Sequence, residues 1–160
     1  KKYSHRKLMN PEEKLRSLEL TLPTAPSPGG NYLTHRRVGS LLYFSGVISI
    51  SDDGAEWIGQ VGAERSLEDG YQAARVCALN VLATLKEITG NLDSIAQFIY
   101  LGGYVNAVSG YGNSPSVVNG ASDLFEAIYG ESGKHARAAV AVAGLPKNAT
   151  VEIQVTVELK

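Results

Sequence analysis

The longest amphipathic pattern of the chain lies between Ser66 and Gly90 and predicts a helix over about 67–89. Ser66 followed three residues later by Asp69 resembles a capping box, in which each side chain accepts a hydrogen bond from the other residue's backbone. Gly90 is the residue type that commonly ends a helix. Between these ends, apolar side chains recur at helical spacing: Tyr71, Ala74, Ala78, Val81, Leu82, Leu85 and Ile88.

Two further helices are predicted from the residues at their ends. Asn10 and Pro11 have the order of a cap followed by a first helical residue, and this short helix runs to about Leu18. Ser114 opens the second helix, which Gly130 ends. Its apolar face consists of Val117, Ala121, Leu124, Phe125 and Ile128.

Apolar runs predict the strands of a sheet. Residues 150–159 alternate strictly between apolar and polar side chains, which indicates one buried and one polar face. Residues 40–51 are rich in β-branched and aromatic side chains, and Gly46 within them indicates a bulge or a close approach of the backbone. Further strands are expected at about 95–105, at 136–143 and, more briefly, at 56–60.

The order of these elements predicts an α+β fold with one mixed sheet and two helices packed on one face. The length of 160 residues fits a single domain. The other face of the sheet would be bare, and we expect it to carry Arg137, Glu152 and Gln154. Because a small domain rarely leaves a whole sheet face to solvent, the pattern also predicts self-association.

Charge and cysteine content exclude several classes of function. The formal net charge is -1, so neither nucleic acid nor a membrane surface is an expected partner. Six of the 15 basic residues fall within positions 1–16, and we interpret them as a short basic end without a binding role. Cys77 is the one cysteine, which excludes an internal disulfide and favours a cytoplasmic location. No apolar run approaches the roughly 20 residues that span a bilayer.

Signatures of catalytic and metal sites are mostly missing from the sequence. His35 and His135 belong to no recognisable Ser-His or Cys-His pattern, and Cys77 lies among apolar residues of a helix. The glycines between Gly102 and Gly112 match neither a phosphate-binding loop nor a dinucleotide fingerprint. The sequence therefore offers no motif for a metal site or for a nucleotide.

Arg137 is the unusual residue of an alanine- and valine-rich strand. A guanidinium in such a strand needs a carboxylate, a phosphate or water. If 136–143 and 150–159 pair as a hairpin, Arg137 and Glu152 lie five residues apart along it, or roughly 16 Å. Either each of them has another partner, or the two meet across a subunit boundary.

Several segments together resemble the RidA/YjgF family, also labelled endoribonuclease L-PSP. Residues 135–155 are similar to its C-terminal signature, an arginine with small residues, then Leu-Pro, then a Val-Glu-Ile strand. Residues 28–49, 61–95 and 118–130 are similar to its opening strand, its long helix and its second helix. The resemblance covers about Gly30 to Leu159. It implies a domain over 30–160, preceded by an extension over 1–29 with a short helix and a Pro/Gly-rich loop.

The resemblance implies a chorismate-mutase-like fold, a homotrimer whose sheets form a central barrel, and clefts between subunits. It also implies hydrolysis of reactive enamines and imines to keto acids and ammonia. This chemistry needs neither a metal nor an organic cofactor, because the imine is already electrophilic. Arg137 would bind the substrate carboxylate, and Glu152 would orient or activate water. The expected substrate-binding positions are Tyr32, Ser45, Gly46, Asn119, Ala138 and Ala139.

Departures from the family pattern indicate a divergent subgroup. Val47 stands where the family often has glutamine, Ala139 stands where a cysteine is common, and one extra residue separates Asn119 from Arg137. The pocket is therefore expected to differ in shape and to be less polar. Two alternatives remain open, a trimer that binds a small carboxylate without turnover and a ribonuclease.

Overall fold

The structure is a computed structural model and describes residues 8–52 and 54–160, so part of the basic start lies outside the described residues. The helices are α1 (Pro11–Ser17), α2 (Leu67–Thr89) and α3 (Ser114–Tyr129), with short 3-10 turns η1 (Leu92–Ser94), η2 (Gly130–Gly133) and η3 (Pro146–Asn148). The strands are β1 (His35–Val38), β2 (Leu41–Phe44), β3 (Val47–Ile48), β4 (Ile95–Asn106), β5 (Ala136–Val142) and β6 (Val151–Leu159).

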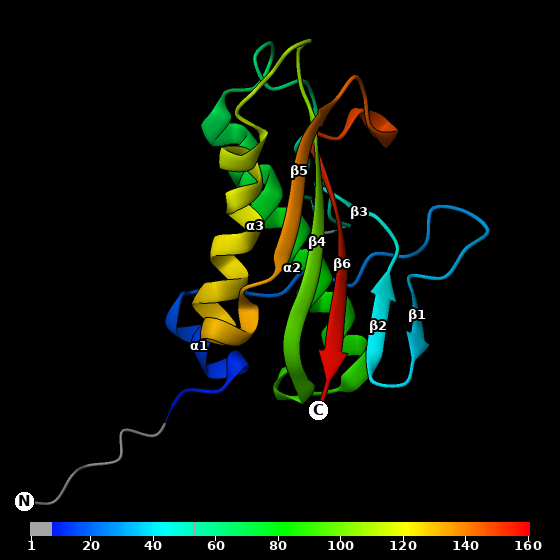
Figure 1. The fold of residues 1–160 in the computed structure, drawn as a ribbon, viewed down its shortest axis with the longest axis vertical. Coiled ribbons are helices and arrows are strands. Elements are labelled where there is room, and N and C mark those ends of the chain that lie inside the picture. Colours follow the sequence, from blue (N-terminus) through cyan, green and yellow to red (C-terminus); the bar gives the residue numbers. More distant parts are fainter. Residues whose placement is uncertain (1–7, 53) are drawn as a thin grey trace, which may run out of the picture.

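The strands form one mixed sheet in the order β1-β2-β6-β4-β5, and β3 also pairs with β6. Only β4 and β5 run parallel; the other pairs are antiparallel. Helices α2 and α3 lie side by side on one face of the sheet, and α1 lies near the end of α3 (Figure 1). This arrangement confirms the predicted α+β fold with a mixed sheet.

Helix α2 has the bounds that the sequence predicts, because its end signals are local. Both bonds of the capping box are present, with Ser66 Oγ and Asp69 Oδ2 each accepting from the other residue's backbone N–H. Gly90 ends the helix in the left-handed conformation, with φ of 71°. None of the helices in the described chain is long and apolar enough to cross a membrane.

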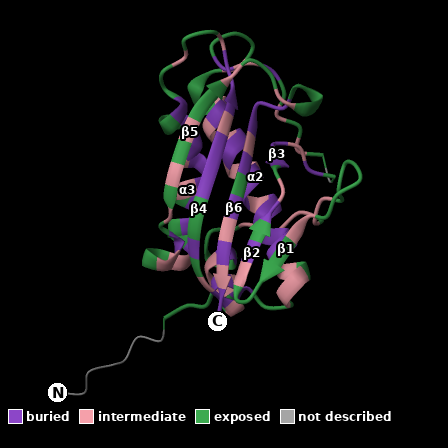
Figure 2. Cartoon of the chain, turned by 45° about the vertical axis from the view of Figure 1, so that its right-hand side comes forward, coloured by how far each residue is buried: buried purple, intermediate pink, exposed green. Residues whose placement is uncertain are grey.

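The core lies between the two long helices and the sheet. Along β6 the apolar residues are buried and the residues between them are more exposed, as the alternating pattern predicts. The rings of Phe98 and Phe125 stack with centroids 4.3 Å apart, which joins β4 to α3. Leu15 adds α1 to the same core. Figure 2 shows the strands in front of α2 and α3, with buried residues alternating with more exposed ones along β6.

Two of the shorter strand predictions need correction. The strand expected over 40–51 is divided into β2 and β3 at Ser45 and Gly46. Residues 56–60 form isolated bridges rather than a strand. Edge strand β1 was not predicted, because its four residues, three of them basic or histidine, show no apolar alternation.

The predicted hairpin between 136–143 and 150–159 is wrong, because β4 lies between β5 and β6. Helix α3 connects β4 to β5 as a crossover, which makes the two strands parallel. The segment from Ala143 to Thr150 then passes over the end of β4 before β6 begins. Sequence separation along a hairpin therefore says nothing about the distance between Arg137 and Glu152.

The placement of Arg137 on the bare sheet face is also wrong. Arg137 pairs with Leu101 of β4, a buried residue on the helix-covered face, and its side chain contacts α3. Glu152 pairs with Tyr104, three residues further along β4 and therefore on the opposite face. The two side chains lie on different faces of one sheet, so they do not meet within a chain.

Candidate functional site

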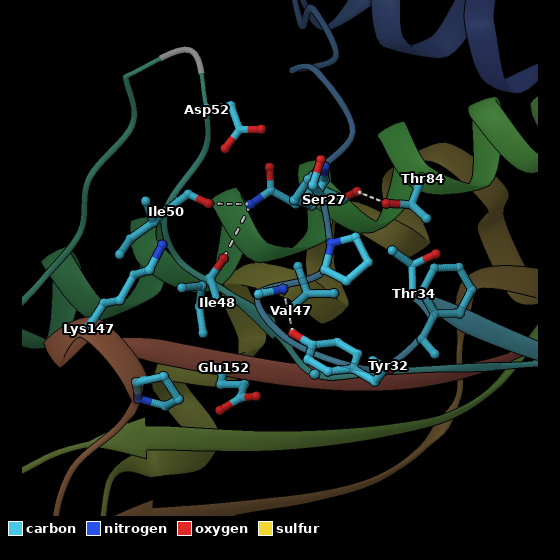
Figure 3. Close-up of a pocket in the computed structure, with 18 residues that line it drawn as sticks. Ser27, Tyr32, Thr34, Val47, Ile48, Ile50, Asp52, Thr84, Lys147 and Glu152 are labelled. Atoms are coloured by element: carbon cyan, nitrogen blue, oxygen red, sulfur yellow. Dashed lines mark hydrogen bonds between the residues drawn. The ribbon is translucent and has the colours of Figure 1, made fainter.

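A cavity of about 380 Å³ opens between the loop 26–34, strand β3, helix α2 and strand β6. Figure 3 shows Ser27, Tyr32, Lys147 and Glu152 around it, contributed by segments far apart in the sequence. Four of the eight expected site residues line this cavity: Tyr32, Ser45, Gly46 and Glu152. The fold therefore brings half of the expected site together in one place.

Glu152 of β6 contributes a carboxylate to the wall of the cavity. It lies beside Ile48 on the face opposite the helices, and its side chain is half-buried. Burial raises the pKa of the Glu152 carboxyl. No residue of the described segments donates a hydrogen bond to this carboxylate, so a molecule entering the cavity would find its oxygens free to accept.

Gly46 allows Glu152 to occupy this position. A Cβ at residue 46 would lie 2.9 Å from Glu152 Cδ and closer still to Oε1. The sequence analysis expects a bulge or a close approach at Gly46, and the structure shows a close approach. The group that approaches Gly46 is the carboxylate of Glu152, the candidate catalytic residue.

Tyr32 and Ser45 hold the loop that covers the cavity. Tyr32 Oη accepts a hydrogen bond from Gly29 N at 3.0 Å, and Ser45 Oγ donates to the carbonyl of Leu33 at 2.6 Å. Both side chains therefore shape the wall of the cavity as well as line it.

Asn80 and Lys147 also line the cavity, and the sequence analysis did not identify them. Asn80 is fully buried, and its Nδ2 donates to the carbonyls of Ile48 at 3.2 Å and Ile50 at 3.0 Å. A buried asparagine on the apolar face of α2 was the available signal, since burying an amide is costly unless it is bonded. Lys147 has a positive φ of 55°, which is uncommon for a residue other than glycine.

The guanidinium of Arg137 is fixed against α3 at the outer edge of the sheet. Its Nη1 donates to Asn119 Oδ1 at 2.8 Å and to Ser122 Oγ at 3.0 Å. Its Nη2 donates to the carbonyl of Pro115 at 3.3 Å. All three acceptors are neutral, and no carboxylate of the described residues forms a salt bridge with Arg137.

These three bonds leave two of the five N–H groups of a guanidinium unused. Two is the number of donors that a bidentate carboxylate needs. Of the remaining expected positions, Asn119 contacts Arg137 directly, while Ala139 packs on the core below it and Ala138 is exposed on the opposite face. One chain therefore carries two separate halves of the expected site, around Glu152 and around Arg137.

Within residues 8–52 and 54–160 no group of three or more His, Cys, Asp or Glu side chains is arranged to hold a metal ion.

Comparisons with known proteins give one family model and several similar proteins. The family model described as "YjgF/chorismate_mutase-like, putative endoribonuclease" matches residues 12–159. Protein TCP17 of Trypanosoma cruzi is 39% identical over 146 residues, which cover 91% of each protein. A crystal structure of a protein of unknown function from Agrobacterium tumefaciens is 38% identical, with a TM-score of 0.85 and 94% of each chain covered.

A crystal structure of RidA from a Psychrobacter species is more distant. It is 26% identical, with a TM-score of 0.59, and the match covers 85% of this chain and 94% of that one. The family model spans almost the whole chain and includes both halves of the candidate site. The chain therefore belongs to the YjgF/RidA family.

Proposed function

We propose that this protein hydrolyses small enamines or imines that carry a carboxylate, and releases a keto acid and ammonia. The observation that carries the proposal is Arg137, whose guanidinium is held by three neutral acceptors and retains two free N–H groups. Such a group suits the carboxylate of a small ligand. The resemblance of the sequence to the RidA/YjgF family implies the same chemistry.

In the proposed reaction, Glu152 takes a proton from water as the water oxygen bonds to the imine carbon, and the π electrons of the C=N bond move to nitrogen. Glu152 then returns the proton to that nitrogen, which gives a carbinolamine. The hydroxyl proton of the carbinolamine next passes through Glu152 to the amino group, the C–N bond breaks, and the C=O bond of the keto acid forms with release of ammonia. Burial raises the pKa of Glu152, which makes its carboxylate a stronger base. Carbon keeps its oxidation level throughout.

Because Arg137 and Glu152 lie on opposite faces, the proposal requires that two copies of the chain form each site. The open face carries the exposed apolar side chains of Tyr43, Tyr100 and Val140. We place this face against neighbouring copies in a homotrimer, so that the β5–α3 edge of one copy meets the cavity of the next. Light scattering is expected to give three times the chain mass, and a monomer at micromolar concentration would contradict the shared site.

The activity is tested with 2-iminopropionate, generated in place from alanine by an amino acid oxidase. We expect pyruvate to form faster than in buffer, and Arg137→Ala to reduce the rate at least about 100-fold, because two charge-assisted hydrogen bonds are lost. Arg16→Ala is the matched control, since Arg16 is exposed on α1. Equal rates with and without protein would contradict the proposal for this substrate.

The second candidate is binding of a small carboxylate without turnover, which the free N–H groups of Arg137 favour equally. Pyruvate would then raise the melting temperature of the protein while imine hydrolysis stays at the rate in buffer. A ribonuclease, which the description of the family names, requires RNA cleavage that copurifies with the protein and survives Arg137→Ala.

Gly46→Ala is expected to reduce turnover about 100-fold with little loss of stability. The added methyl group collides with the end of the flexible Glu152 side chain, which can move away, and a displacement of about 1 Å costs this much in rate. Gly144→Ala is the control, because a Cβ there meets nothing within 4 Å. Thermal unfolding and imine hydrolysis are measured on both variants. Full activity in Gly46→Ala would show that Glu152 need not occupy its present position.

A further inference from the structure

Behind Arg137, two polar side chains continue its hydrogen-bond network into the protein. Ser122 Oγ lies 3.0 Å from Arg137 Nη1 and 2.9 Å from His135 Nε2. On the other side of the imidazole, Nδ1 lies 2.9 Å from the carbonyl oxygen of Gly133. The ring is half-buried and meets Phe125 edge-on, with centroids 6.2 Å apart. Three elements, α3, η2 and β5, thus converge behind the guanidinium.

The chemistry of the partners assigns every hydrogen in this network. A carbonyl oxygen can only accept, so Nδ1 of His135 carries the proton, and Nε2 of the neutral ring is an acceptor. Ser122 must then donate to Nε2, and its oxygen accepts from Arg137, which can only donate. Burial, more than any other effect, lowers the pKa of His135, so the neutral ring predominates at pH 7.

We infer that Ser122 and His135 are positioning residues, which fix the guanidinium of Arg137 with its remaining N–H groups directed to a ligand. The ligand is the carboxylate of the proposed function, and in that respect the inference rests on it. A free arginine side chain has many rotamers, so fixing it in advance reduces the entropy lost when a carboxylate binds. Ser122 cannot exchange its donor and acceptor roles, because His135 already fixes the direction of its hydroxyl.

Of the charged side chains near His135, Arg137 is the one that shifts the pKa of the ring. Arg137 on β5 disfavours a second positive charge on the ring, and this effect adds to burial in lowering the pKa. Lys134, next to the ring in the chain, is paired with Glu126 of α3 and Glu131 of η2. Among the described residues no acid forms a salt bridge with His135. The carbonyl of Gly133 accepts from the ring and raises its pKa, but burial has the larger effect and lowers the pKa.

The test compares Ser122→Ala, His135→Phe and His135→Gln with the wild-type chain. We expect Ser122→Ala to raise the Kd for pyruvate and the KM for the imine about tenfold, with kcat little changed, because one hydrogen bond to the charged guanidinium is lost. His135→Phe is expected to shift both in the same direction, because the hydroxyl of Ser122 loses the acceptor that fixes its orientation. His135→Gln is expected to restore affinity, since its amide oxygen can accept from Ser122. Ser116→Ala, at an exposed serine of the same helix, is the control. Unchanged Kd in Ser122→Ala, or no restoration by glutamine, would overturn the inference.

A second measurement does not depend on any ligand. ¹⁵N NMR of the full-length protein is expected to show His135 protonated at Nδ1 and not at Nε2 at pH 7. The guanidinium of Arg137 is expected to rotate slowly, with resolved Nη signals that average in Ser122→Ala. If the wild-type protein neither binds pyruvate nor hydrolyses the imine, the proposed function is wrong. The NMR signals would still show whether Ser122 and His135 fix the guanidinium of Arg137. A ring protonated at Nε2, or Nη signals unaffected by Ser122→Ala, would contradict it.

Discussion

Glu152→Gln is expected to lose imine hydrolysis about 10²- to 10⁴-fold, the range that general acid–base catalysis contributes, and to unfold at a higher temperature than wild type at pH 7. The activity is lost because an amide cannot take a proton from water. The stability rises because the half-buried carboxylate accepts no hydrogen bond from the described residues, so its charge is costly in the folded state.

The pH dependence of this gain follows from the raised pKa of Glu152. A carboxyl whose folded pKa exceeds its unfolded value binds more protons when folded, so stability falls as pH rises between the two values. The difference in melting temperature between Glu152→Gln and wild type should therefore vanish below the usual pKa of glutamate, about 4.3, and be full above the raised folded pKa. Calorimetry from about pH 4 to pH 8 measures it.

Glu158→Gln is the matched control for this experiment. Glu158 lies on the same strand and the same face as Glu152, outside the cavity, and accepts a hydrogen bond from Gln97 Nε2 at 2.7 Å. Its variant is expected to keep full turnover. An active Glu152→Gln would exclude Glu152 as the proton acceptor, and the reaction would need another base.

Gly120→Ala is expected to destabilise the fold strongly, although it adds only one methyl group. Gly120 is the residue at which α3 approaches α2: an added Cβ would lie 2.9 Å from the carbonyl carbon of Tyr71 and closer still to its oxygen. Backbone cannot move aside as a side chain can, so the helices must separate. We expect a loss of about 3 kcal/mol in the free energy of unfolding. For a chain of this size that lowers the melting temperature by about 6–12 °C.

Gly112→Ala provides the comparison, because a Cβ at residue 112 meets nothing within 4 Å. This variant should unfold within about 0.5 kcal/mol of wild type, as surface substitutions usually do. Chemical denaturation of both variants measures the difference. Equal stability of Gly120→Ala and Gly112→Ala would mean that α2 and α3 do not pack at the distance seen in the structure.

The sequence predicted those elements whose signals lie within the element itself. The bounds of α2 follow from Ser66, Asp69 and Gly90, and the faces of β6 follow from its alternation. Strand β5 gave no such information about its faces, because alanine is compatible with both. The side of the sheet on which Arg137 lies could therefore not be read from residues 136–143.

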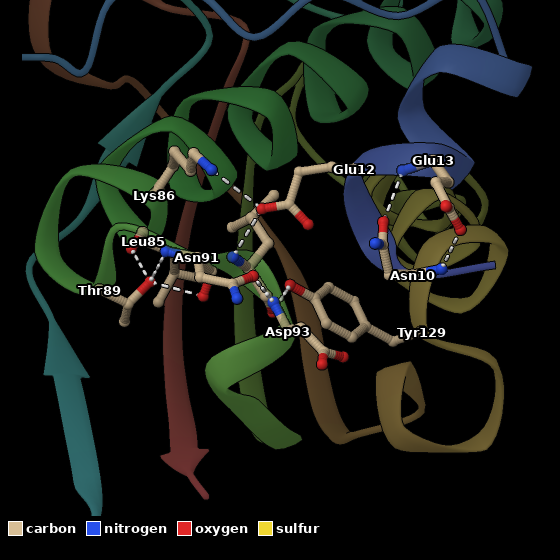
Figure 4. A network of polar contacts seen from close by, with 10 residues as sticks. Asn10, Glu12, Glu13, Leu85, Lys86, Thr89, Asn91, Asp93 and Tyr129 are labelled. Atoms are coloured by element: carbon tan, nitrogen blue, oxygen red, sulfur yellow. Dashed lines mark hydrogen bonds and ion pairs between the residues drawn. The ribbon is translucent and has the colours of Figure 1, made fainter.

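Contacts between distant segments could not be predicted from local patterns. Glu12 of α1 accepts a hydrogen bond from Lys86 Nζ of α2 at 3.0 Å (Figure 4). The same carboxylate also accepts from the backbone N–H of Leu92 at 2.9 Å. Tyr129 donates to the carbonyl of the same Leu92 at 2.9 Å. Neither the capping motif at Asn10 nor the apolar face of α3 identifies these partners, which only the packing of α1, α2 and α3 brings together.

For the candidate site too, the sequence predicted some features and only the tertiary structure showed the others. By itself the sequence determined the fold class, the long helix and, through family resemblance, that Arg137, Glu152, Gly46 and Tyr32 are the residues to examine. Only the tertiary structure placed Arg137 against Ser122 and Asn119 on one face and Glu152 in a cavity on the other. The physical reason is that periodicity specifies which side chains share a face, whereas strand order and helix docking depend on contacts between residues far apart in the chain.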